Sequence, residues 1–178
     1  MNPNEVYVRM AHNNAWATLR LHRAVGELDD AAYRATRTSF FPSLHLTLSH
    51  ILFVDLYYVD ALEGANRPAP WDEYDAFDKT GTFAELRERQ RAVDKRLIAC
   101  AARDLDEEIR LQRATHVQTD TRANVLLHLF EHQIHHRGQA HAMLSGTTVK
   151  PPQLDEFFLR DELPLREAEL KELGLPLR

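Results

Sequence analysis

Histidines with metal-binding spacing gather in one short stretch of the sequence. The run LLHLFEHQIHHRGQAH, residues 126–141, contains five of the chain's ten histidines: His128, His132, His135, His136 and His141. Residues four apart on an α-helix project from nearly the same side, roughly 6 Å apart along the axis. Two imidazoles so placed can converge on one metal ion, each nitrogen about 2.0–2.1 Å from it. His132 and His136 have this spacing, and so do His128 and His132, whereas His135 points about 100° away from His136.

The spacing alone does not establish a metal site, because ten histidines in 178 residues predict roughly 0.55 four-apart pairs by chance. A polar helix face, or buried histidines bonded to backbone, would give the same pattern. The surroundings favour a metal. Val125, Leu129 and Met143 indicate that this segment packs in a core, where imidazole nitrogens need partners. His50 lies in the most apolar segment of the chain and has the same need, which a metal shared by the two segments would satisfy.

The segments that must position these histidines are predicted to be helices. Apolar residues recur at helical spacing, and the abundant Ala, Leu, Glu and Arg favour helix. The segment around His50 is apolar over most of its circumference, so we expect it to be central. Thr82 and Glu85 predict a capping box, and Asn2 predicts a cap on the first helix. The four main helices are expected at residues 3–28, 42–65, 82–105 and 121–145.

The remaining segments are predicted with less regular patterns. We expect residues 66–81 to be a connection whose Trp71, Tyr74 and Phe77 lie against the helices, residues 108–116 to contain a short extended segment, and residues 154–160 and 164–173 to be short C-terminal helices. Long connections permit crossovers, so a simple up-down order is not required. The third helix should turn one stripe inward: Phe83, Leu86, Gln90, Val93, Leu97 and Cys100. For residues 3–28 the sequence does not indicate which face of the helix is buried.

Composition and charge argue against several classes of protein. A net charge of -5 without a basic stretch disfavours nucleic-acid binding. The sequence contains no run of about 18 apolar residues, so no membrane span is predicted. The N-terminal MNPNEVYVRM lacks the apolar stretch of a signal peptide. The lone cysteine, Cys100, fits a reducing cytoplasm, so we expect a cytoplasmic protein with residues 1–178 in one domain. The absence of nucleophile-elbow, phosphate-cradling and HExxH motifs argues against serine-triad hydrolysis.

Four stretches of the chain together resemble the DinB family of predicted metalloenzymes. They are LLHLFEHQIHHRGQAHAML at residues 126–144, SFFPSLHLTLSHILFVDLYYV at 39–59, AHNNAWATLRL at 11–21 and PPQLDEFFL at 151–159. They fall in the family's order and span nearly the whole chain. Tyr58 stands where relatives often carry tryptophan, and residues 161–178, a C-terminal extension, are the least family-like part.

The resemblance implies an all-α fold, a four-helix bundle with long crossover connections and short C-terminal helices. It also implies one divalent metal ion held by His50, His132 and His136, which selects the pair His132 and His136 over the pair His128 and His132. Several relatives form homodimers. Three nitrogen ligands leave positions open for water or substrate, which is the pattern of catalytic sites. Imidazole suits zinc, nickel and other late transition metals.

Two functions follow from the resemblance. Some relatives resemble thiol S-transferases or isomerases, so the first is a metal-dependent enzyme that acts on small molecules, as a transferase using a low-molecular-weight thiol or as a hydrolase. The alternative is a metal-binding stress protein without turnover. A third interpretation is a plain bundle with structural histidines. No general base is identifiable: His128, His135 and Glu131 are candidates for proton transfer, although Glu131 is better explained as a solvated helix residue. Arg137 either has a role at the site or is a surface or ion-paired arginine. Gln139 either has a role at the site or serves helix packing.

Overall fold

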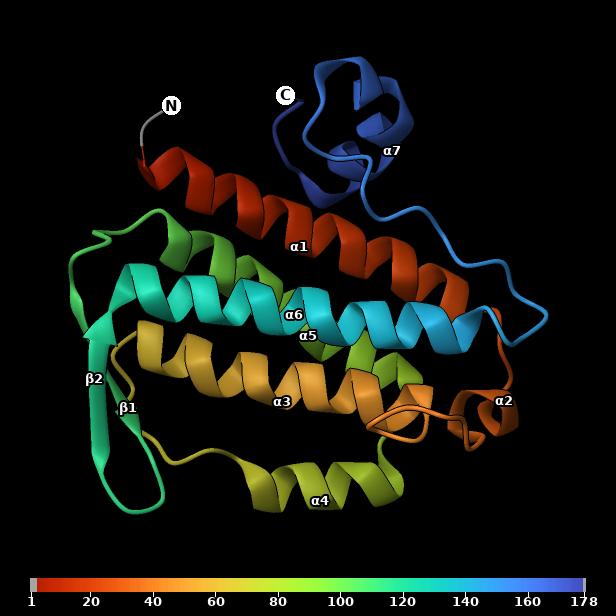
Figure 1. Ribbon diagram of the computed structural model, residues 1–178, viewed down its shortest axis with the longest axis horizontal. Coiled ribbons are helices and arrows are strands. Elements are labelled where there is room, and N and C mark those ends of the chain that lie inside the picture. Colours follow the sequence, from red (N-terminus) through yellow and green to blue (C-terminus); the bar gives the residue numbers. More distant parts are fainter. Residues whose placement is uncertain (1–2, 178) are drawn as a thin grey trace.

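Four long helices dominate the structure, a computed structural model in which residues 3–177 are described (Figure 1). They are α1 (Pro3–Val25), α3 (Leu44–Leu62), α5 (Phe83–Ala101) and α6 (Arg122–Leu144). Helices α1 and α3 each pack against both α5 and α6, so the four enclose one shared apolar core. All four predicted helices are present, although the first three end three or four residues before the predicted bounds, at Val25, Leu62 and Ala101 and not at residues 28, 65 and 105. The predicted cap at Asn2 lies outside the described residues.

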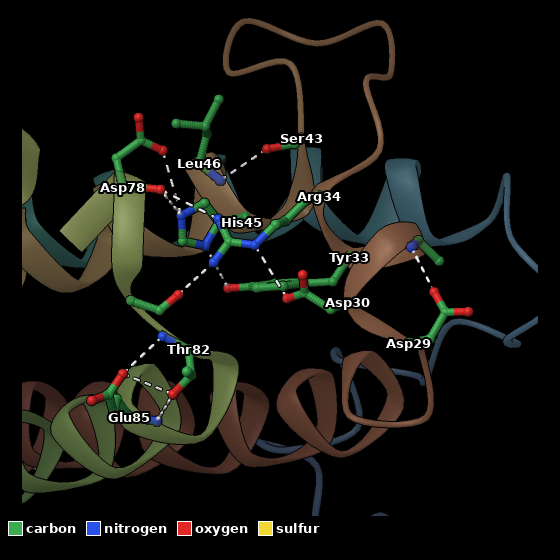
Figure 2. A network of polar contacts seen from close by, with 12 residues as sticks. Asp29, Asp30, Tyr33, Arg34, Ser43, His45, Leu46, Asp78, Thr82 and Glu85 are labelled. Carbon is green, nitrogen blue, oxygen red and sulfur yellow. Dashed lines mark hydrogen bonds and ion pairs between the residues drawn. The ribbon is translucent and has the colours of Figure 1, made fainter. Parts of the chain in front are cut away.

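The helices begin where side chains supply partners for their first backbone amides. The capping box is confirmed at the start of α5: the Glu85 amide donates to the Thr82 hydroxyl at 3.2 Å, and the Thr82 amide donates to the Glu85 carboxylate at 2.8 Å (Figure 2). Ser43 caps α3 by accepting from the Leu46 amide at 3.1 Å. Nearly all of α3 is buried, as its apolar circumference predicts. The inward stripe predicted for α5 is buried from Leu86 to Cys100.

Two short helices occupy segments for which no helix was predicted. Helix α2 (Asp30–Arg34) begins at Asp29, whose carboxylate accepts from the Ala32 amide at 2.7 Å. Helix α4 (Trp71–Thr80) lies in the segment predicted as a connection. Pro68 and Pro70 lie directly before this helix. They therefore mark where α4 begins, and the segment as a whole is not an irregular loop. The expectation that this segment lies against the helices is confirmed for Tyr74 and Phe77, which pack on the core, but not for Trp71, which is 47% exposed.

A two-stranded antiparallel sheet joins α5 to α6, so the all-α expectation holds for most of the chain but not for this segment. Strand β1 (Glu108–Gln112) pairs with β2 (Val117–Thr121), from Glu108 opposite Thr121 to Gln112 opposite Val117. The prediction of one extended segment at 108–116 found the first strand and missed the return. Ile109 and Leu111 are buried against the core, which fixes the hairpin beside the C-terminal end of α3 (Figure 1).

The C-terminal segment covers the outer face of α1. The short 3-10 helix η1 (Arg160–Glu162) leads into α7 (Leu163–Leu173), close to the predicted 164–173, whereas the helix predicted at 154–160 is wrong. Trp16 contacts Phe157 with ring centroids 5.4 Å apart, and Ala17 and Leu170 complete this second apolar cluster. Helix α1 is therefore buried on two sides, which explains why its sequence shows no single apolar stripe. Among residues 3–177, no helix is both long and apolar enough to cross a membrane.

Candidate metal centre

Three histidines from two helices converge at one point. His50 comes from α3, and His132 and His136 come from successive turns of α6. One ring nitrogen from each lies within 4.8 Å of the others, and the Nε2 atoms of His50 and His132 are 2.9 Å apart. The packing of α3 against α6 brings together residues that are far apart in the sequence.

The donor set fits a divalent transition metal. Imidazole ligands bind at about 2.0–2.1 Å, so two nitrogens on one ion lie at most about 4.2 Å apart. The three nitrogens, all within 4.8 Å of one another, lie close to this range. Nδ1 of His132 is buried without a hydrogen-bond partner among the described residues, and buried nitrogens of this kind are normally satisfied.

A hydrogen bond to Gln139 sets the orientation of His136. Nδ1 of His136 is 2.8 Å from Oε1 of Gln139, an atom that can only accept, so Nδ1 carries the proton and Nε2 is left unprotonated. The amide of Gln139 in turn donates to Nε2 of His135 at 3.0 Å. Metal-binding histidines usually have such a partner on the nitrogen that faces away from the ion. Gln139 thus holds a ligand candidate in place, and His135 stands outside the cluster, bonded to Gln139.

Burial keeps the three imidazoles neutral. Desolvation lowers the pKa of His132 to about 3 and that of His50 to about 4, and the neighbouring imidazoles add to both effects. Burial also lowers the pKa of His136, against the opposing bond to Gln139. Because a histidine must lose its proton to bind a metal, these groups are ready to act as ligands near neutral pH.

The cluster opens onto a cavity of about 440 Å³. The Phe41 ring contacts His50 in a tilted arrangement, with ring centroids 4.3 Å apart, and also contacts His136 at 5.6 Å. The cavity wall comes from α3, the start of α4, the hairpin and α6. Its larger side chains are Tyr57, Tyr58, Trp71, Gln112, Arg113 and His128. The three histidines therefore face space for a small molecule.

The other candidates from the sequence lie in different surroundings. His128 is an exposed cavity residue whose ring contacts Tyr58 at 5.1 Å. Glu131 is exposed and outside the cluster. Cys100 is a buried core residue. His45, which also interrupts the apolar surface of α3, is bonded to the Asp78 carbonyl and to Tyr33, as Figure 2 shows, and is a satisfied core histidine.

A buried polar cluster lies in the core between the four long helices. Gln90 donates to Asp55 at 2.7 Å and to Asp94 at 3.1 Å, and Asn14 donates to Asp94 at 3.0 Å and accepts from Arg137. Burial, with Asp94 nearby, raises the pKa of Asp55 to about 8, and burial raises that of Asp94 to about 6 and lowers that of Arg137 to about 10. Of the two carboxyl groups Asp55 has the more strongly raised pKa, so it is the one that holds a proton to higher pH. Arg137 is a core residue and not a surface one.

Phe41, Trp71 and Arg113 are the residues of the site that the sequence did not single out as functional. Trp71 and Phe41 could have been noticed as aromatic residues next to Pro70 and Pro42, but nothing in the local pattern connects them to His50. Arg113 ends a weakly patterned segment and carries no local signal at all.

The comparisons with known proteins bear on the same residues. A model described as the DinB family matches residues 1–167, which include the three clustered histidines and all elements up to the first turns of α7. The comparison with curated proteins found no match.

Proposed function

The chain belongs to the DinB family, and from that membership we propose that it binds one divalent transition-metal ion through His50, His132 and His136 and uses the ion in a reaction on small molecules. The proposal rests chiefly on the convergence of three neutral imidazoles beside an accessible cavity. We also propose that the four long helices form the DinB-type four-helix bundle, with the connections that carry α4 and the hairpin as its long crossovers.

Zinc or nickel suits the ligand set best, since imidazole favours late transition metals. With three protein ligands, coordination positions remain open, as in catalytic and unlike closed structural sites. A bound ion of this kind would supply Lewis acidity, which lowers the pKa of a coordinated water or thiol.

The chain's own side chains would bind and orient the reactants. His136 is held in one tautomer by Gln139, and Phe41 packs against the His50 ring. The cavity admits a small molecule against Tyr57, Tyr58 and Trp71. His128 lines the same cavity and is the candidate for moving a proton at its ring nitrogens. We propose transfer of a low-molecular-weight thiol, with hydrolysis of a small substrate as the second form of the reaction.

One observation favours the alternative, a metal-binding stress protein without turnover. Among the described residues, no carboxylate lines the cavity, so a strong general base is missing from its wall. Incubating metal-loaded protein with small thiols and a panel of electrophiles would separate the two, because only the enzyme would form a thioether product at a rate above that of the apoprotein.

The metal proposal is tested by elemental analysis of protein purified without a histidine tag. We expect one ion per chain, and calorimetric titration with Zn²⁺ and Ni²⁺ should show one high-affinity site. His132→Ala and His136→Ala should lose this site, because each removes one of three nitrogens. His135→Ala is the matched control on the same helix and should keep it. A protein that takes up no metal after reloading, or a control that behaves like the ligand variants, would contradict the proposal.

Two further expectations accompany the proposal. Because relatives associate in pairs, we propose a homodimer, which light scattering during size-exclusion chromatography would detect. We propose a cytoplasmic location, supported by the lone Cys100.

A further inference from the structure

Arg113 places a positive charge in the wall of the cavity that holds the histidine cluster. It follows β1 in the turn of the hairpin and is half-buried. Its Nε donates to Oε1 of Gln118 at 3.0 Å, and its Nη2 donates to the Tyr58 hydroxyl at 3.2 Å. Both acceptors are uncharged. Within residues 3–177, no ion pair links Arg113 to a carboxylate, and its further polar neighbour, the Tyr57 side chain, is also uncharged.

The guanidinium is held in place by aromatic rings. Its central carbon lies 5.5 Å from the ring centroid of Tyr57 and 5.6 Å from that of Tyr58, within the range of cation–π attraction. Tyr57 is fixed by its hydroxyl, which donates to the Gln112 carbonyl at 2.9 Å. A guanidinium ordered in advance loses less conformational entropy when it binds a ligand.

The charge balance of the cavity differs from that of the whole chain. The protein has a net charge of -5, yet no acidic residue of the described part of the chain lines this cavity. Arg113 and the neutral histidines face the same space, with Val54, Pro68 and Ala69 as apolar wall. A half-buried positive charge without an internal counterion attracts an anion from solution.

From these observations we propose that the cavity binds a small organic acid, with its carboxylate on Arg113 and its apolar body against Tyr57, Tyr58 and Trp71. A planar carboxylate matches the fork of a guanidinium. A phosphate dianion would call for more donors than this single side chain, and no lysine lines the cavity in residues 3–177. That the acid is also a reactant at the histidines rests on the proposed function; that Arg113 binds it does not.

The test uses the metal-free full chain, so that the carboxylate cannot bind an ion instead. Benzoate is the probe, and benzamide is its uncharged analogue of nearly the same shape. Trp71 lines the cavity, whereas Trp16 is fully buried against the C-terminal segment, so tryptophan fluorescence reports on cavity occupancy, and Trp71→Phe should abolish the response. Calorimetry supplies an independent affinity. We expect benzoate to bind at least tenfold more tightly than benzamide.

The variant Arg113→Met keeps most of the side chain and removes the charge, so benzoate affinity should fall at least tenfold while the affinity for benzamide stays the same. Arg113→Lys should recover part of the loss. Arg110→Met is the matched control, because Arg110 is exposed on β1, three residues before Arg113, and does not line the cavity. Equal binding of benzoate and benzamide, no binding of either, or unchanged benzoate affinity in Arg113→Met would overturn the inference, and the first two comparisons need only the wild-type chain.

The two proposals fail separately. Benzoate binding that depends on Arg113 in a chain that takes up no metal would support the anion site and contradict the metal-dependent function. Metal uptake together with a benzoate affinity that does not change in Arg113→Met would support the metal site and contradict the anion site.

Discussion

Gln139 is the residue that fixes which nitrogen of His136 is available to a metal. Its Oε1 accepts the proton of Nδ1 at 2.8 Å, so the ring cannot turn or change tautomer without losing this bond. Partners of this kind typically contribute 10–100-fold to metal affinity.

We therefore predict that Gln139→Leu lowers zinc affinity by about 10–100-fold without removing the site. Gln139→Glu should keep affinity at or above the wild-type level, because a carboxylate accepts the same proton. Competition with a chelator of known affinity measures both. If the leucine variant held zinc as tightly as wild type, the bond to Gln139 would have no part in positioning His136.

The sequence predicted the residues of the site unevenly. His132 and His136 follow from helical spacing, but His128 and His132 have the same spacing and only the family resemblance separated the pairs. His50 lies 82 positions from His132, and no local pattern links them. The structure brings the three together, while their binding of metal stays a prediction. Phe41, Trp71 and Arg113 could not be foreseen because their positions depend on how distant segments pack.

At the scale of elements, the strongly patterned segments were predicted and the short ones were not. Helix α3 is apolar nearly all round and α5 begins with a capping box, so both were recognisable. Helix α4 follows Pro68 and Pro70, which predicted a loop, and the hairpin is stabilised by burial of Ile109 and Leu111 against helices far away in sequence. Tertiary packing therefore decides where local propensity is weak.

The C-terminal segment offers a test of packing at this scale. Phe157 is buried against Trp16, whereas its neighbour Phe158 is 41% exposed. We predict that Phe157→Ala lowers the free energy of unfolding by about 3 kcal/mol, through lost burial and the cavity left behind. Phe158→Ala, the control, should cost about 1 kcal/mol or less. Urea denaturation followed by the fluorescence of Trp16 measures both, and similar losses in the two variants would contradict the packing described for Phe157.

At the scale of the whole molecule, the buried polar cluster makes stability depend on pH. Asp55 on α3 faces Asp94 on α5, Arg137 on α6 and Asn14 on α1, with the imidazole of His22 also buried on α1. The folded-state pKa of Asp55 is raised to about 8 from 3.8. The folded protein therefore binds a proton that the unfolded chain has already released, so stability falls as pH rises toward the folded pKa.

Comparison with Asp55→Asn isolates the contribution of Asp55. Buried histidines such as His22, with its pKa lowered to about 3, add stability as pH rises through the unfolded-state value of 6.5, and they do so equally in both proteins. We predict that between pH 6.5 and 8 the metal-free wild type loses about 1–2 kcal/mol of unfolding free energy relative to Asp55→Asn. Denaturant titrations of both proteins at four pH values provide the measurement, and parallel profiles would show that Asp55 is ionised in the folded state.

On α6 each of the two candidate ligands is followed directly by a residue buried in the interior: Gln133 after His132, and Arg137 after His136. A rotation of α6 about its axis would therefore move the buried side chains and the two imidazoles together. A core substitution that rotates α6 should lower the affinity for zinc, although the substituted residue does not contact the ion. Zinc affinity across a series of core variants should then follow how well each variant packs.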